Sequence, residues 1–172
     1  EEASYRPSLF TPEGIGWEEF AEKRIGMELE RAASFNIELV CGVIQYKDKT
    51  QYPEAFSAFI DMVLQWFPFQ DLLFEHGKDG LTVVFTNMDL EHAQREAELI
   101  RRRTRENLGK EETLRIGLSA RNGRILSGKR LLYEAEGALK QAAAQDEGKG
   151  GVVAFYPDPE KYREYLKQTN SQ

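Results

Sequence analysis

The sequence has little cysteine, no long apolar stretch and no low-complexity segment. Its one cysteine, Cys41, lies in the apolar run IELVCGVI; no disulfide can form within one chain, and we expect Cys41 to be a small buried hydrophobe. No apolar stretch approaches the roughly 20 residues of a membrane-spanning helix, and no signal peptide is visible. The sequence starts at Glu1 rather than at a methionine, which leaves open a longer parent protein with a membrane or sensor segment upstream.

Basic residues are outnumbered by acidic ones. Lys and Arg number 23 against 29 Asp and Glu, a net charge of −6, which disfavours non-specific binding to nucleic acid or to an anionic membrane. A chain of 172 residues that is 41% hydrophobic and 30% charged is typical of one globular domain. We expect a lead-in over residues 1–12, a single domain over 13–157, and a short closing helix with a polar tail over 158–172.

Residue clusters with recognisable chemistry are few. His76 and His92 have no second histidine, cysteine or acidic cluster at ligand spacing, so the sequence predicts no metal site. Ser119 and Ser127 have no histidine at motif distance, which argues against a nucleophilic triad. The basic run over 101–105 lies among glutamates of one predicted helix, as expected of a solvated face with i, i+4 ion pairs.

Hydrophobic periodicity gives an alternating order of elements. Ser127 and either Asn87 or Asp89 are the expected N-caps of two of the helices. We expect helices over 16–34, 53–67, 89–108, 128–147 and 158–167, and strands over 37–46, 72–76, 81–85, 113–120 and 152–156. The order predicts an α/β (α+β) fold, with a βαββαβ core whose mixed, mainly antiparallel sheet is flanked by helices.

The centre of that core is LLFEHGKDGLTVVF, two apolar runs joined by Gly-Lys-Asp-Gly. Asp79-Gly80 is a strong signal for a tight turn, because glycine tolerates positive φ and the aspartate side chain stabilises the turn. Taken alone, these residues predict a plain β-hairpin.

Four motifs in order nevertheless resemble the GGDEF family of diguanylate cyclases, which have a nucleotide-cyclase-like fold. EHGKDGLTVVF resembles its Arg-Tyr-Gly-Gly-Asp-Glu-Phe hairpin, and RIGLSA its Ser-Ile-Gly-Val-Ala strand. LLYEAEGALKQA resembles its Leu-Leu-x-x-Ala-Asp-x-Ala-Leu-Tyr-x-Ala helix, and GKGGVVAF its closing turn and strand. The resemblance covers residues 10–157. It implies a bacterial, cytoplasmic signalling domain of the kind that joins two GTP molecules into cyclic di-GMP with divalent metal ions.

The residues that hold the metals in that family are largely replaced. Its Asp-Ile-Asp-x-Phe-Lys motif corresponds to the segment that starts Gly42-Val43-Ile44, where both acids are absent. The hairpin keeps one glycine and one acid, but a lysine replaces the second glycine and a glycine the second acid. The vestigial hairpin is Gly77, Lys78, Asp79, Gly80 and Leu81.

Other positions implied by the resemblance have changed as well. The phosphate-contacting positions fall on Ala143 and Lys149, and the product-inhibition motif appears as Pro68 to Asp71 without its arginine. KDKTQYPEAF offers no equivalent of the guanine-reading residues, and EGIGWEEF lacks the Asn-Arg pair of the N-terminal motif. A site that acts as a unit loses several orders of magnitude in rate when one essential group is removed.

The sequence therefore predicts a catalytically inactive GGDEF-type domain with no catalytic residue, no bound metal and no cofactor. We expect it to work in the cytoplasm, alone or as part of a membrane-anchored protein, through contact with itself or with another protein domain. Three alternatives stay open. The domain retains GTP or cyclic di-GMP as an allosteric ligand, it is a residual nucleotide-cyclase-like enzyme using other residues, or it is an unrelated α/β domain with this topology.

Overall fold

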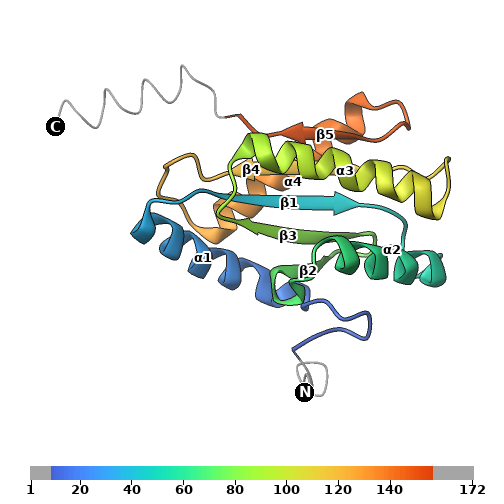
Figure 1. Ribbon diagram of the computed structural model, residues 1–172, viewed down its shortest axis with the longest axis horizontal. Coiled ribbons are helices and arrows are strands. Elements are labelled where there is room, and N and C mark those ends of the chain that lie inside the picture. The colour runs from blue at the N-terminus through green and yellow to red at the C-terminus, as the bar shows by residue number, and fades with distance from the viewer. Residues whose placement is uncertain (1–8, 157–172) are drawn as a thin grey trace.

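The sheet has five strands in the order β2-β3-β1-β4-β5 (Figure 1). The computed structural model describes residues 9–156. All neighbouring strands pair antiparallel except β4 and β5, which are parallel. The predicted mixed, mainly antiparallel sheet is thus confirmed. The strands are β1 (Leu39–Gln45), β2 (Leu73–His76), β3 (Gly80–Thr86), β4 (Arg115–Ala120) and β5 (Gly151–Ala154).

Helices cover both faces of this sheet. One apolar cluster joins α1 and α4 to one face, and a larger cluster joins α2 and α3 to the other. No helix within residues 9–156 is long and apolar enough to cross a membrane. The helices are the 3-10 turn η2 (Glu18–Phe20), α1 (Ala21–Phe35), α2 (Pro53–Trp66), the 3-10 turn η3 (Gln70–Leu72), α3 (Leu90–Leu108) and α4 (Gly128–Gln145).

The helix ends follow the predicted capping chemistry. Asp89, one of the two expected caps, accepts a hydrogen bond from the His92 N–H, and Ser127 accepts one from the Arg130 N–H. Asn87, the other candidate, instead adopts a left-handed φ of 53° between β3 and α3. Pro53 lies in the first turn of α2, where its missing N–H has no helical partner to lose. The expected helix over 158–167 lies outside the described residues.

Strand β1 lies at the centre of the sheet and is buried on both faces. It is shorter than the predicted 37–46, and Cys41 within it is fully buried, as expected. Burial raises the pKa of the Cys41 thiol. Next to β1, β4 and α4 approach so closely at Gly117 that an added Cβ would lie 2.3 Å from the Ala135 carbonyl oxygen. This contact fixes α4 over the sheet.

Candidate functional site

The hairpin predicted from Gly-Lys-Asp-Gly forms and lies beside the C-terminal end of β1. Strand β3 pairs antiparallel with β1, and Gln45 is the register partner of Gly80. The turn begins at Gly77, whose φ of +62° favours glycine. At Gly80 the packing is tight, because an added Cβ would lie 2.5 Å from the Ile44 carbonyl oxygen. The close pairing of hairpin and β1 therefore has no room for a side chain at position 80.

The side chain opposite Asp79 is that of Gln45. Its Nε2 donates a hydrogen bond of 2.9 Å to Asp79 Oδ2. Gly42, Val43 and Ile44, the positions that the sequence resemblance assigns to the metal site, are instead buried within β1. Gly42 is enclosed by side chains of β3 and β4. Gln45 was not among the predicted site residues, although it is the first polar residue after the apolar run and so marks the end of the buried strand.

An ion pair next to Gln45 extends this contact across the sheet. Arg115 on β4 forms a hydrogen-bonded ion pair with Asp146, the residue that ends α4, and its Nη1 lies 3.4 Å from Gln45 Oε1. The hydrogen bond from Arg115 holds the pKa of Asp146 below its usual value. Asp79, Gln45, Arg115 and Asp146 thus form one polar chain from the hairpin to the end of α4, and we call it the cross-sheet chain. It places a guanidinium near the hairpin acid.

The lysines that follow β1 are paired with carboxylates. Glu112 accepts hydrogen bonds from Tyr46 Oη at 2.6 Å and from Lys47 Nζ at 2.9 Å. Burial works to raise the pKa of Glu112, but these two bonds outweigh it and lower the pKa. Lys49 lies 2.5 Å from a carboxylate oxygen of Glu75 on β2. These pairs tie the β1–α2 loop to the hairpin and to the β4 lead-in.

A groove of about 720 Å³ runs between the hairpin and α4, with Gln45, His76 and Asp79 among its lining residues. His76 Nε2 lies 3.2 Å from Glu136 of α4, which links the two walls. Within residues 9–156, no group of three or more His, Cys, Asp or Glu is arranged to hold a metal ion. Several of the polar side chains that line this groove are paired with one another.

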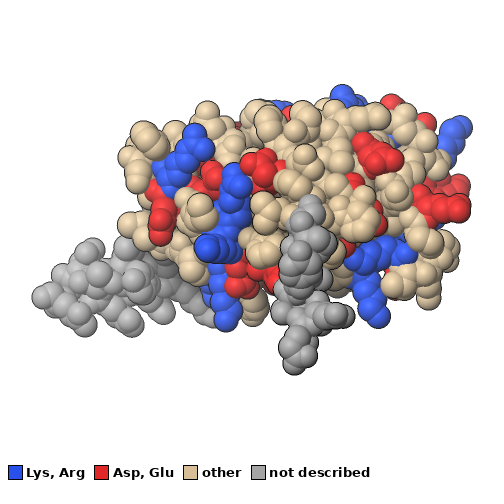
Figure 2. Space-filling model, turned by 90° about the horizontal axis from the view of Figure 1, so that it is seen from below, with Lys and Arg blue, Asp and Glu red and all other residues tan. Residues whose placement is uncertain are grey.

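The remaining residues expected from the resemblance are dispersed. Ala143 is exposed on α4, and the main-chain oxygen of Lys149 accepts hydrogen bonds from Arg101 and Arg105 of α3. Pro68 lies between α2 and η3. Asp71, in η3, pairs with Arg24 of α1 at 3.2 Å. Basic and acidic side chains are interspersed on the face that Figure 2 shows.

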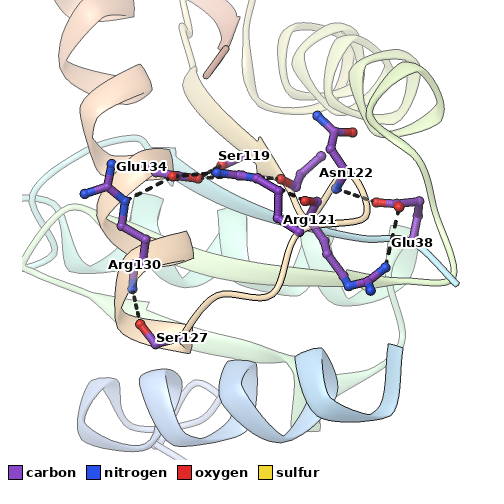
Figure 3. A network of polar contacts seen from close by, with 9 residues as sticks. Glu38, Ser119, Arg121, Asn122, Ser127, Arg130 and Glu134 are labelled. Atoms are coloured by element: carbon purple, nitrogen blue, oxygen red, sulfur yellow. Dashed lines mark hydrogen bonds and ion pairs between the residues drawn. The ribbon is translucent and has the colours of Figure 1, made fainter. Parts of the chain in front are cut away.

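A buried polar cluster at the other end of α4 was not predicted (Figure 3). The carboxylate of Glu134, a residue 2% exposed, accepts hydrogen bonds from Ser119 at 2.7 Å, from Arg124 at 2.8 and 2.9 Å, and from Arg130 at 3.1 Å. Burial opposes ionisation of Glu134, but the bonds from Arg124 and Ser119 prevail and lower its pKa. This cluster ties the β4–α4 loop to α4 and has a structural part in the fold.

Comparisons with known proteins give a consistent result at the level of the fold. No protein-family model and no curated protein matches the sequence. The GGDEF domain of DgcB from Caulobacter crescentus, solved in complex with c-di-GMP, superposes with a TM-score of 0.66 at 13% identity, over 87% of this chain and 94% of that one. The chain has the fold of a GGDEF domain.

Two further solved structures share this GGDEF fold. The active GGEEF domain of a diguanylate cyclase from Vibrio cholerae has a TM-score of 0.69 at 16% identity, with 88% of this chain and 100% of that chain covered. Diguanylate cyclase SiaD from Pseudomonas aeruginosa, solved in complex with its activator SiaC, has a TM-score of 0.69 at 16% identity. The match covers 86% of this chain and 62% of that chain. These likenesses show the fold alone, so the site has to be interpreted from its own residues.

Proposed function

We propose that this chain is a member of the GGDEF family that has lost cyclase activity and serves as a signalling domain. On this proposal residues 13–157 are the working unit, located in the cytoplasm. The observation that carries the proposal is the cross-sheet chain. In it the Asp79 carboxylate accepts a hydrogen bond from the amide of Gln45, and the Arg115 guanidinium lies 3.4 Å from the Gln45 side-chain oxygen.

The chemistry of cyclisation explains why this arrangement argues against catalysis. Magnesium is held by oxygen ligands, chiefly carboxylates, in near-octahedral positions, and it neutralises charge on a reacting triphosphate. Here the side chain of Gln45 presents an N–H donor to Asp79. The packing around position 80 leaves no space for the side chain of a second acidic residue. Arg115, which forms an ion pair with Asp146, also places its guanidinium 3.4 Å from Gln45.

A signalling domain without catalytic activity can act by binding another protein. SiaD, which shares the fold, was solved bound to an activator protein, and by analogy we propose that this domain pairs with itself or with another protein domain. Large exposed apolar side chains are available for such contacts, namely Leu9, Met27, Phe35, Phe69, Ile125 and Tyr133. Sedimentation velocity over a hundredfold concentration range separates self-association from contact with a different protein.

The test of inactivity is incubation of the purified domain with GTP and either Mg²⁺ or Mn²⁺, followed by chromatography. We expect GTP to be recovered unchanged. Formation of cyclic di-GMP above a no-protein blank contradicts the proposal.

Two features favour a second function: the groove beside the hairpin, and Lys78, which is exposed in the turn of the hairpin. In this version the domain binds GTP or cyclic di-GMP without turnover and acts as a nucleotide receptor. Calorimetric titration with each nucleotide distinguishes the two versions. A ligand present at a hundred times its dissociation constant stabilises the fold by about 2.7 kcal/mol, so a melting curve checks any heat observed.

A further inference from the structure

The segment before α1 runs along the free edge of the hairpin. Gly16 donates a main-chain hydrogen bond of 2.7 Å to the Leu73 oxygen and accepts one of 2.8 Å from the Glu75 N–H. Ile15, beside it, is fully buried in the core. Since Leu73 and Glu75 belong to β2, this segment extends the sheet by a short parallel bridge to Phe74. The N-terminal segment is therefore attached directly to the hairpin.

Two residues after this bridge, Glu18 reaches the turn of the hairpin. Its Oε1 accepts a hydrogen bond of 2.8 Å from the main-chain N–H of Gly77. The two residues are separated by 59 positions in sequence, so the contact joins the N-terminal segment to the tip of the hairpin. Glu18, Gly77 and Lys78 are all exposed to solvent.

Main-chain N–H groups in turns bind anions, and a hydrogen bond to a charged acceptor is stronger than one to a neutral acceptor. At this turn the Gly77 N–H points to an anionic oxygen, and Lys78 follows immediately. The anion is a carboxylate supplied by the same chain. An oxygen of a small phosphate-bearing ligand has the same requirements, a main-chain donor and a nearby cation.

We propose that Glu18 is an internal competitor at the hairpin turn, which a small phosphate-bearing ligand must displace in order to bind. Displacement releases one of the contacts that hold the N-terminal segment against the hairpin. By linkage, anything that pulls that segment away from the hairpin strengthens ligand binding to the same extent. The inference rests on the proposed function in one respect, that the hairpin is a binding element and not a catalytic one.

The expected effect follows from competition. If Glu18 covers the turn about nine-tenths of the time, only about a tenth of the molecules are competent to bind, and removing its carboxylate strengthens binding about tenfold. A tenfold change corresponds to about 1.4 kcal/mol. Glu18→Gln keeps an oxygen acceptor without the charge, so its affinity for the ligand falls between those of the native chain and Glu18→Ala.

The probe is sodium tripolyphosphate, titrated calorimetrically without divalent metal into the native chain, Glu18→Ala, Glu18→Gln and the control Glu22→Ala. Glu22 is an exposed acid in the first turn of α1, so its removal changes the net charge equally. We expect binding to tighten about tenfold for Glu18→Ala, with Glu22→Ala within twofold of the native chain. Adding Lys78→Ala to Glu18→Ala reverses the gain.

Hydrogen exchange supplies an independent readout of the coupling. Saturating tripolyphosphate is expected to speed exchange of the Glu75 amide in the native chain, because that amide is bonded to Gly16 of the displaced segment. Equal affinity of Glu18→Ala and Glu22→Ala, or no binding by any variant, overturns the inference. Either result is independent of whether the domain makes cyclic di-GMP, so failure here is distinguishable from failure of the proposed function.

Discussion

Replacing Glu134 by alanine removes the central acceptor of the buried cluster on α4. The carboxylate accepts from Ser119, Arg124 and Arg130, and its side chain is 1% exposed. Its loss leaves a buried hydroxyl and two guanidinium groups without their shared partner. The variant therefore tests whether this cluster holds the β4–α4 loop against α4.

The two arginines differ in how far hydration compensates for the loss of the Glu134 carboxylate. Breaking a fully buried ion pair costs about 3–5 kcal/mol. The Arg130 side chain is 57% exposed and that of Arg124 is 19% exposed, so both regain some hydration. We accordingly expect Glu134→Ala to lower the free energy of unfolding by about 2–4 kcal/mol. For a chain of this size that corresponds to a fall in Tm of roughly 5–12 °C.

Urea unfolding followed by circular dichroism measures this change at pH 7. Gln141→Ala, at an exposed position of the same helix, is the matched control and is expected to stay within about 0.5 kcal/mol of the native chain. A loss below about 0.5 kcal/mol for Glu134→Ala itself refutes the reasoning, because it means that the buried cluster contributes no more than an exposed residue.

Three further outcomes are expected. Because the folded pKa of Glu134 is lowered, its contribution to stability is complete above about pH 4.3 and is lost as the pH falls through the folded pKa. Urea unfolding between about pH 5 and 3 should therefore show that Glu134→Gln loses less stability with falling pH than the native chain does. Parallel curves of unfolding free energy against pH for the two proteins contradict this. Gly117→Ala forces β4 and α4 apart and is expected to lower the free energy of unfolding by about 3 kcal/mol or more. Gly137→Ala, with open space around it, is expected to raise the free energy of unfolding by at most about 1 kcal/mol. Equal melting temperatures refute that contrast. Finally, the buried Cys41 thiol should react with a disulfide reagent only at the rate of global unfolding, and fast labelling of the folded chain rules this out.

The secondary structure was largely predictable because its signals are local. Asp89 and Ser127 cap helices with their own side chains, and Asp79-Gly80 forms a turn within four residues. The apolar run before Tyr46 predicted a strand buried on both faces, and its central place in the sheet accounts for that burial.

The site was harder to predict because it depends on register. An apolar run shows that a strand exists, but it does not show which residue meets the hairpin turn. The resemblance led to Gly42 and Ile44, whereas the antiparallel register with β3 places Gln45 next to the turn. Glu18 and Arg115 are ordinary charged residues in the sequence. Their partners lie 59 and 31 positions away and are known only from the fold.

The central claim, that the domain does not catalyse cyclisation, is tested most directly by its product. Enzymes commonly turn over about 10 times per second, so even a millionfold loss leaves a rate of about 10⁻⁵ per second. At about 50 μM protein, a few hours at that rate would form micromolar product, which mass spectrometry detects readily. We predict no cyclic di-GMP with GTP and Mg²⁺ or Mn²⁺, and product that rises in proportion to protein concentration would contradict the account.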